Sequence, residues 1–516
     1  MNFRWFLKST FVGLALSSTI VIPSAYAQKG IAQGLSSANP RVGVQPTRIA
    51  SGFQLQEVAQ GSEPLENPST KIKKFGFLAD GTNTVPDENT YVVFDQNPGG
   101  PDSSFDYGRH FLYQGHENSG NMAYVTRINL DITEAAHRIT LLTPEGASGF
   151  TGFNSIDGST WNPFTRTFFF TQEAGSNGGV IQLTAGWPAV ATTLDGIVGK
   201  AGYEGVHLDN DGNLYLVEDS GGTSVNIIPG DTTSAKTAKQ PNSFVYRFVP
   251  YDIADFSKGG KLQSLQVSIG GNALVFTADA VADTFSTRQL QLHTPGSSWP
   301  VRWITVHDTA VDGTASFNAN AAAKKAGATP FKRPENMAFL PGSGFNTFVF
   351  VATGDTDIFA GSQPALQARG SYGSLFRVDF HGANEAGTIS LLYLGDSVHN
   401  SFDNLTFIDN FTVVATEDRG DSLHGQLNTL DSIWAFDVRK PGTPPQRFVA
   451  LGRDPESLAD AQATGDGDNE PTGLIVSDGS PTVGGLLYKQ VKPNASRWFF
   501  TQQHGENVVW EIVPAN

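Results

Sequence analysis

One short pattern recurs six times along this chain: an apolar strand that ends in acidic or polar residues and is followed by a loop and another strand. These strands with their ends lie at residues 109–117, 167–173, 213–219, 347–355, 411–418 and 497–504. Their near-continuous aromatic and β-branched runs are typical of strands that are buried on both faces. Such a regular recurrence is the signature of a repeat architecture.

The repeat predicts an all-β protein, a six-bladed β-propeller in which four-stranded units surround a central axis. The alternative is a large β-sandwich, which would not need so regular a recurrence. Uneven spacing between the units predicts long decorating loops, notably at residues 227–242, 292–332 and 451–469. Residues 319–326 are the one stretch that looks locally helical.

The first 27 residues have the pattern of a secretory signal peptide. Arg4 and Lys8 precede an apolar stretch at residues 11–22, and Ala25-Tyr26-Ala27 matches a small-residue cleavage site. We therefore expect a periplasmic or extracellular protein in which residues 28–516 form a single β-propeller domain. No later stretch of the sequence is long and apolar enough to predict a membrane span.

The charge and the cysteine count exclude several classes of function. Removal of Arg4 and Lys8 with the leader takes the formal net charge from −16 to −18. So acidic a protein is a poor partner for nucleic acid or for an anionic membrane. The chain has no cysteine, which excludes a disulfide framework, a thiolate metal site and a cysteine nucleophile.

Carboxylates recur at two positions of the repeat. At the exit of the apolar strand stand Glu117, Glu173, Glu218 or Asp219, Asp355, and Glu417 or Asp418. At the start of the preceding strand stand Glu204, Glu335, Asp403 and Glu470. Equivalent positions of the innermost strands of a propeller form a ring around its axis.

Protonation can relieve one or two members of such a ring, but not the whole set. The ring therefore predicts bound hard cations, for which carboxylate oxygens are the preferred ligands. The alternative is that these are ordinary turn acids at strand ends, although glutamate is not a turn-forming residue.

Three weaker candidates lie near the same positions. The acidic segment 465–470 leads directly into Glu470. His116 and His504 adjoin strand ends and could be metal ligands or acid–base groups. Either histidine could equally be a surface or hydrogen-bonding residue.

In their order along the chain, these motifs resemble the PhoX-type alkaline phosphatases, a family of six-bladed propellers. The resemblance extends over residues 54–513 and rests on His116-Glu117, Thr171-Gln-Glu173, Tyr203-Glu204-Gly205, Val217-Glu-Asp219, Phe331-Lys-Arg-Pro-Glu335, Asp403-Asn-Leu and Asn469-Glu-Pro-Thr-Gly473. It implies hydrolysis of phosphomonoesters at a calcium- and iron-containing cluster on the propeller axis, outside the cytoplasm.

The metal ligands that the resemblance implies are Glu117, Glu173, Glu204, Asp219, Glu335, Asp403, Glu417 and Glu470. Arg333 or Arg419 would clamp the phosphate, and Lys332 would add a point charge. Arg333 could instead form a structural ion pair with a neighbouring carboxylate. The sequence has no Gly-x-Ser-x-Gly motif, so a serine triad is not expected.

Two features depart from the family pattern. The family's cysteine ligand to iron has no counterpart here, because the matching stretch 154–158 offers Ser155 or Asp157 in its place. We therefore expect several Ca²⁺ ions first, with Fe³⁺ as the alternative. The leader lacks a twin arginine, which predicts export by the general route.

The sequence predicts a monomeric, metal-dependent phosphoric monoester hydrolase that acts on a small phosphorylated substrate and binds neither nucleic acid nor membrane. One rival is a calcium-dependent lactonase or phosphotriesterase-like propeller, which would need fewer acids. The other is a non-catalytic propeller whose acids bind structural calcium.

Overall fold

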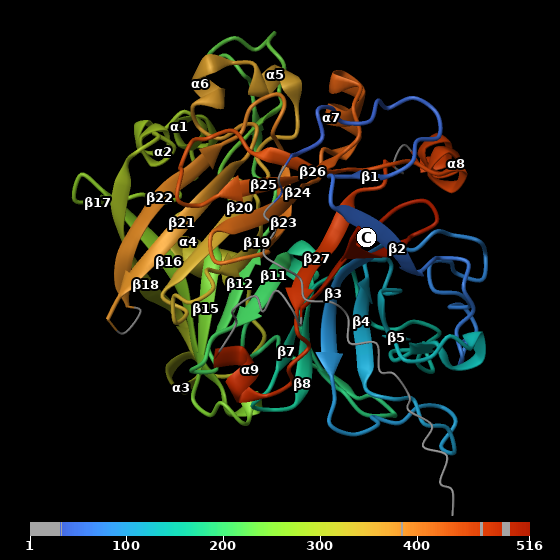
Figure 1. Ribbon diagram of the computed structural model, residues 1–516. Coiled ribbons are helices and arrows are strands. Elements are labelled where there is room, and N and C mark those ends of the chain that lie inside the picture. The colour runs from blue at the N-terminus through green and yellow to red at the C-terminus, as the bar shows by residue number, and fades with distance from the viewer. Residues whose placement is uncertain (1–30, 32, 383–384, 465–467, 488–495, 516) are drawn as a thin grey trace, which may run out of the picture.

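The protein is all-β, with sheets in a propeller-like arrangement around a common axis (Figure 1). The computed structural model describes residues 31, 33–382, 385–464, 468–487 and 496–515. The predicted leader and residues 465–467 of the acidic segment lie outside the described residues.

Two sheets follow the predicted four-stranded repeat and come from consecutive segments of the chain. The first contains β3 (Pro86–Val93), β4 (His110–His116), β5 (Tyr124–Asn129) and β6 (Ile139–Leu141). The second contains β7 (Ile156–Asn162), β8 (Thr167–Gln172), β9 (Gly179–Thr184) and β10 (Ala191–Thr193). All their pairings are antiparallel.

Two further sheets join the beginning of the described chain to its end. One contains β23 (Phe402–Phe407), β24 (Thr412–Glu417), β25 (Ser432–Asp437), β26 (Gln446–Ala450) and β1 (Arg48–Ile49). The other contains β27 (Pro471–Ser477), β28 (Arg497–Gln502), β29 (Val509–Pro514) and β2 (Phe53–Ala59). The pairing of β2 with β29 joins distant segments and covers an edge that would otherwise be unpaired.

The largest sheet has ten strands, whereas the repeat predicted separate four-stranded units. Its members are β11 (Tyr203–Leu208), β12 (Leu214–Glu218), β15 (Val245–Pro250), β16 (Gly260–Ile269), β17 (Asn272–Ala273), β18 (Ser298–Asp308), β19 (Pro334–Phe339), β20 (Thr347–Ala352), β21 (Ser374–His381) and β22 (Ala386–Leu394).

The strand β18 makes this sheet continuous, because it pairs with β16 on one side and with β22 on the other. It lies within residues 292–332, which the sequence predicted to be a loop, so that expectation was wrong. The burial along β18 is irregular, with Val301 and Trp303 buried among exposed or half-buried neighbours. An outer strand of this kind lacks the continuous apolar run that marks the inner strands.

Six strands, one at the inner end of each unit, form a closed ring. Around the axis, β3 is followed by β7, β11, β19, β23 and β27, and β27 lies beside β3 again. The next strand in each unit is packed on both faces. In β8, for example, Phe168 and Phe170 belong to one apolar cluster and Phe169 to another. The alternation of side chains along a strand therefore explains the continuous aromatic run.

Short helices occupy the connections. They are α1 (Ala280–Thr284), α2 (Thr287–Leu292), α3 (Thr309–Asp312), α4 (Ala319–Ala326), α5 (Ile358–Gly361), α6 (Pro364–Gln367), α7 (Gly420–Leu427), α8 (Pro455–Thr464) and α9 (Val483–Leu487). Smaller elements are the hairpin of β13 (Ser224–Val225) with β14 (Ala238–Lys239), and the 3₁₀ turns Ala135–His137, Gly175–Asn177 and Phe256–Lys258. The helix expected at residues 319–326 is confirmed as α4. Among the described residues, no helix has the length and apolar character needed to span a bilayer.

Candidate metal-binding site on the propeller axis

The first ring of side chains comes from the second residue of each inner strand. Its members are Asp87, Asp157, Glu204, Glu335, Asp403 and Thr472. In the five strands that carry an acid here, the register with the neighbouring strand shifts directly around it, as between Pro86 and Asn89 in β3. A β-bulge of this kind bends the strand and redirects a side chain.

The second ring comes from the residue that follows the adjoining strand of each unit. Its members are Glu117, Glu173, Asp219, Thr353, Asp418 and Gln503. The neutral members bond to acids of the rings. Thr353 Oγ1 donates to Glu335 Oε1 at 2.5 Å, and Gln503 Nε2 donates to Asp87 Oδ2 at 2.6 Å. The rings therefore approach each other closely.

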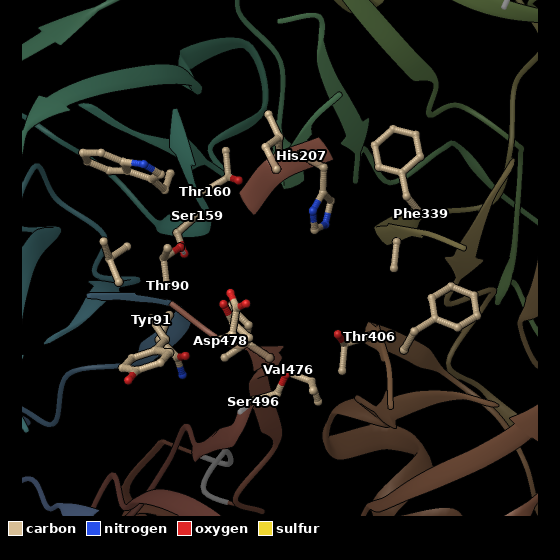
Figure 2. A pocket seen from close by; sticks show the side chains of 18 of the residues that line it. Thr90, Tyr91, Ser159, Thr160, His207, Phe339, Thr406, Val476, Asp478 and Ser496 are labelled. Carbon is tan, nitrogen blue, oxygen red and sulfur yellow. Dashed lines mark hydrogen bonds between the residues drawn. The ribbon is translucent and has the colours of Figure 1, made fainter. Parts of the chain in front are cut away.

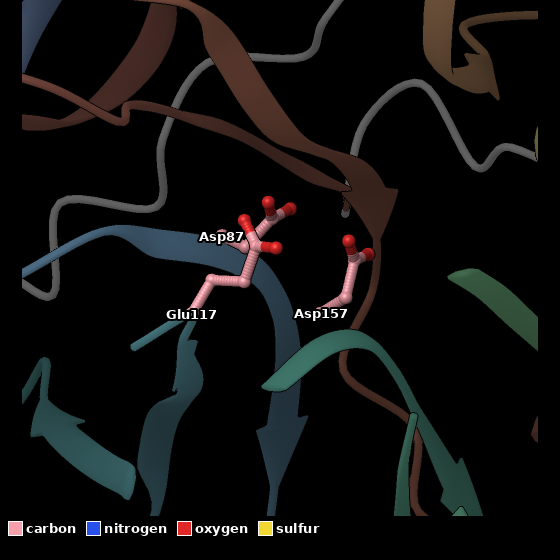
Figure 3. A group of neighbouring side chains, drawn as sticks. All are labelled: Asp87, Glu117 and Asp157. Carbon is pink, nitrogen blue, oxygen red and sulfur yellow. The ribbon is translucent and has the colours of Figure 1, made fainter. Parts of the chain in front are cut away.

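The acids gather in clusters whose ligand atoms lie close together. One oxygen each from Asp87, Glu117 and Asp157 lie within 4.8 Å of one another, and Figure 3 shows the three carboxylates converging from three strand ends. Oxygens of Glu173, Glu204 and Asp219 form a second group within the same limit. A side-chain hydrogen bond also joins Asp403 to Glu470, which directly precedes β27.

Burial raises the pKa of these acids, and their like-charged neighbours raise it further. The pKa is raised to about 7 for Asp87 and Glu173 and to about 8 for Asp403. For the following acids the pKa lies well above the usual range: Glu117, Asp157, Glu204, Glu335 and Glu470. The site as folded therefore disfavours its own ionised form.

Positive charge reaches the site from two side chains. Arg333 Nε donates to Asp219 Oδ2 at 2.7 Å, and its Nη2 lies 3.4 Å from Glu335 Oε1. Lys239, on β14, lies close enough to Asp219 and Glu335 to interact with their charge. Burial and the neighbouring Arg333 lower the pKa of Lys239. These two cations are far outnumbered by the acids of the rings.

The donor chemistry of the site fits bound hard cations. All the acids offer oxygen, the preferred ligand atom of Ca²⁺. Asp219 Oδ2 accepts a hydrogen bond from Arg333, but the buried Oδ1 of the same carboxylate has no hydrogen-bond partner among the described residues. A buried, unpaired carboxylate oxygen is costly unless a cation or a donor satisfies it.

The structure does not bring Glu417 and Arg419 to the axis, although both were predicted for the site. Glu417 accepts hydrogen bonds from the backbone N–H groups of Asn400 (3.2 Å) and Ser432 (2.9 Å). It also accepts one from Arg419 Nη2 at 3.1 Å, and the two side chains are at most 2% exposed. This pair lies inside the sheet and stabilises the strand end.

Glu417 does not face the axis because successive side chains at the end of a strand point in opposite directions. Glu218 likewise turns inward and accepts hydrogen bonds from Tyr246 and Asn320, whereas Asp219 faces the axis. By the same register Asp418, and not Glu417, is the axial residue of its unit, and its charge acts on Asp403 and Glu470. Neighbouring residues at a strand end point to opposite sides.

Lys332 and Asp355 also form a buried pair instead of facing a substrate. Lys332 Nζ lies 2.8 Å from Asp355 Oδ2, and the side chains are 3% and 0% exposed. Asp355 accepts a further hydrogen bond from the backbone N–H of Lys239. The predicted point charge is therefore already neutralised.

The two predicted histidines and the acidic segment have structural partners. His116 is fully buried between the hydroxyl groups of Thr84 and Thr126. His504 Nδ1 lies 3.6 Å from Asp460. In the acidic segment, Asp468 pairs with Arg41 and Arg453.

Asp87 was missed by the sequence analysis, and Asp157 was considered only as a replacement for a cysteine. A usable signal was present for both. Pro86-Asp87-Glu88-Asn89 resembles Pro334-Glu335-Asn336, and Ile156-Asp157-Gly158 resembles Tyr203-Glu204-Gly205. Lys239 gave no such signal, because it reaches the site from a hairpin far from the repeated positions.

Beyond the rings, side chains of the inner strands line a cavity of about 170 Å³, which we call the axial cavity. Figure 2 shows Thr90, Ser159, Thr160, His207 and Thr406 around it. Glu88 stands between the rings and this cavity and accepts hydrogen bonds from Ser159 N (2.7 Å) and from Asn336. Burial raises its pKa to about 7.

Comparison with known families identifies the relationship. Residues 228–432 match the family model of alkaline phosphatase PhoX. The match confirms the resemblance predicted from the sequence. It contains Arg333, Glu335, Asp403 and Asp418 of the axial site. No curated protein matches the chain.

Among solved structures, the chain is similar to Pseudomonas fluorescens PhoX in complex with vanadate, a transition state analogue. The TM-score is 0.57 at 12% identity, and the match covers 94% of this chain and 98% of that chain. A calcium structure of the Trichoderma reesei carbohydrate-active enzyme family AA12 has a TM-score of 0.36 at 13% identity, covering 93% and 100% of the two chains. The likeness to the PhoX structure supports the propeller-like fold.

Proposed function

We propose that this protein is an exported, metal-dependent phosphatase that hydrolyses phosphomonoesters at the axial carboxylate rings. The observation that carries the proposal is the convergence of nine ring acids, two groups of which have ligand atoms within 4.8 Å. The PhoX match over residues 228–432 supports it independently.

The residues that would hold cations fall into three groups. The first is Asp87, Glu117 and Asp157, and the second is Glu173, Glu204 and Asp219. The third is Asp403, Asp418 and Glu470, with Glu335 between the second and third. This set replaces Glu417 by Asp418 and adds Asp87 and Asp157.

We propose Ca²⁺ for these positions, because every ligand is an oxygen atom and the chain offers no thiolate. Fe³⁺ is the alternative. When bound, such cations supply neutralisation of phosphate charge and a lowered pKa for coordinated water.

Arg333 is the residue of this chain best placed to bind the phosphate. Asp219 and Glu335 hold its guanidinium at the rings through Nε and Nη2, and Nη1 would bind a phosphate oxygen. The orientation of Arg333 is therefore set before a substrate arrives. Lys239 adds positive charge on the same side.

We also propose the number of blades and the cellular location of the protein. We count the ten-stranded sheet as two blades joined by β18, which makes six blades in one domain over residues 28–516. We propose cleavage of the leader after Ala27 and export to the periplasm or beyond.

The test is a hydrolysis assay on the purified mature protein with p-nitrophenyl phosphate, bis-p-nitrophenyl phosphate and a lactone. Each substrate is measured before chelation, after chelation and after addition of Ca²⁺ or Fe³⁺, with elemental analysis of the starting material. We expect the monoester to be hydrolysed fastest, with loss on chelation and recovery with Ca²⁺.

Glu335→Gln and its matched control Glu385→Gln complete the design, since Glu385 is an exposed glutamate that directly precedes β22 and pairs with Arg247 of β15. Preferred hydrolysis of the lactone or of the diester would replace the proposal by the corresponding rival. Bound calcium without hydrolysis of any substrate would establish a binding protein instead.

A further inference from the structure

A polar groove opens beside the axial site, and the mechanism above does not use it. The groove has a volume of about 590 Å³, which lies within the range of small-molecule sites. Its lining includes four amide side chains and three hydroxyl side chains: Asn121, Asn154, Gln172, Asn177, Ser119, Ser155 and Thr193. We call it the amide groove.

Residues that are close in the chain to two acids of the rings, Glu117 and Glu173, line the amide groove. Gln172 and Ala174, which flank Glu173, both line it, and so does Ser119, which follows Glu117 by two residues. Ser155 also lines it, and its carbonyl accepts a hydrogen bond from the backbone N–H of Glu173 at 2.8 Å. A group attached to a phosphate at Glu117 and Glu173 would therefore have the groove beside it.

The lining is electrically balanced and rich in both donors and acceptors. Its one charged pair is Lys200 with Asp195, at 3.4 Å. None of the described residues that line it is aromatic. The groove therefore suits a neutral group with several hydroxyls, each of which donates and accepts, and provides no surface on which an aryl group could stack.

Part of this lining is preorganised and part is available to a ligand. Asn154 Nδ2 donates to Asn121 Oδ1 at 2.8 Å, while the backbone N–H of Asn121 donates to Asn154 Oδ1 at 2.7 Å. The exposed side chains of Asn177, Thr193 and Ser119 form no hydrogen bonds within the described part of the chain.

We propose that the amide groove binds the leaving group of the substrate, and that this leaving group is a sugar or another polyol. The proposal rests on the proposed phosphatase function and deepens it. In the reaction, water adds its oxygen to phosphorus and the P–O bond to the sugar breaks. The sugar leaves as a neutral alcohol, and inorganic phosphate carries the other proton of the water.

The experiment compares kcat/KM for glucose 6-phosphate and p-nitrophenyl phosphate in the calcium-reconstituted protein. Asn177→Ala should lower kcat/KM for glucose 6-phosphate about tenfold, the effect of one or two lost hydrogen bonds, and leave the aryl ester unchanged. Thr193→Val should act in the same direction and more weakly. Because each variant is compared with the wild type on the same ester, the different reactivities of the two leaving groups cancel.

The matched control is Asn272→Ala, an exposed asparagine on β17 far from the groove along the chain, which should change neither ester. Free glucose should inhibit hydrolysis of p-nitrophenyl phosphate competitively in the wild type, and at about tenfold higher concentration in Asn177→Ala.

Equal effects of Asn177→Ala on both esters, or no effect on either, would overturn the inference and leave the phosphatase proposal intact. Hydrolysis of the aryl ester without hydrolysis of glucose 6-phosphate would do the same. If neither ester is hydrolysed in any metal state, the phosphatase proposal itself fails, and the inference fails with it.

Discussion

At one end of the inner strands, the second residue of five of the six strands is an acid whose carboxylate faces the axis. Towards the other end, the same strands line the axial cavity with hydroxyl and apolar side chains such as Thr90, Thr406 and Leu405. The sheet pairing is irregular at the first end, where bulges redirect side chains, and regular beyond it.

The same six strands are therefore stabilised in two ways, by neutralisation of acids at one end and by burial of apolar area at the other. At the acid end, the carboxylates repel one another unless cations or bound protons neutralise them. The same repulsion favours the binding of cations, which the proposed function requires. The cavity end has no ring of carboxylates among the described residues, and buried apolar side chains such as Leu405 stabilise it.

Removal of the cations should have the largest effect, and the effect should depend on pH. The pKa of Asp87 is raised from 3.8 to about 7, and that of Glu173 from 4.5 to about 7. Between about pH 4 and pH 8 the metal-free folded state therefore binds more protons than the unfolded state, so its free energy of unfolding falls as pH rises. For Asp87 alone the loss is on the order of 4 kcal/mol.

Thermal unfolding after chelation, followed from pH 5 to pH 8, checks this expectation. Tm should fall steeply with pH in the chelated protein and much less after calcium is restored. The same slope in both samples would show that cations do not neutralise the rings.

Loss of one ring acid should abolish most activity. Glu204→Gln should lower kcat/KM for a phosphomonoester by at least about 1000-fold, or about 4 kcal/mol, because it removes an oxygen donor shared by the second group. Asp478→Asn, at the axial cavity, is the control and should leave kcat/KM unchanged. A comparable loss of kcat/KM in the two variants would show that catalysis depends on the cavity end as much as on the acid end.

Shortening an apolar side chain at the cavity end should lower the stability of the protein and leave its catalytic rate unchanged. Leu405→Ala should lower the free energy of unfolding by about 3 kcal/mol, since Leu405 is 2% exposed and its removal enlarges a cavity. Denaturant unfolding measures the loss, and kcat per folded molecule should stay at the wild-type value. A drop in kcat would show that the cavity end supports the reaction.

The smallest effect is expected at Arg333, the arginine that we propose to bind the phosphate. Arg333→Lys should lower kcat/KM about tenfold, or about 1.4 kcal/mol, mainly through KM. Lysine keeps the positive charge but has a single nitrogen, which cannot bind Asp219, Glu335 and the phosphate in the fixed geometry of a guanidinium. Steady-state kinetics with p-nitrophenyl phosphate checks it. An unchanged KM would remove Arg333 from the phosphate site and leave it as a structural partner of Asp219.

The sequence predicted the repeated strands and most of the axial acids because both recur at constant positions. It did not distinguish Glu417 from Asp418, since one residue at a strand end decides which side chain faces the axis and which accepts backbone hydrogen bonds. Lys332 is a second example. A lysine can bind a phosphate, but the ammonium group of Lys332 is buried in an ion pair with Asp355.

By itself, the sequence determined that short buried strands recur along the chain, that acidic residues outnumber basic ones, and that no cysteine can bind a metal. These features depend only on composition and local periodicity. Only the tertiary structure decided that Asp87 and Asp157 join the rings, that Lys239 reaches them from a hairpin, and that β18 unites two units in one sheet. These outcomes depend on contacts between segments far apart in the chain, which no local pattern records.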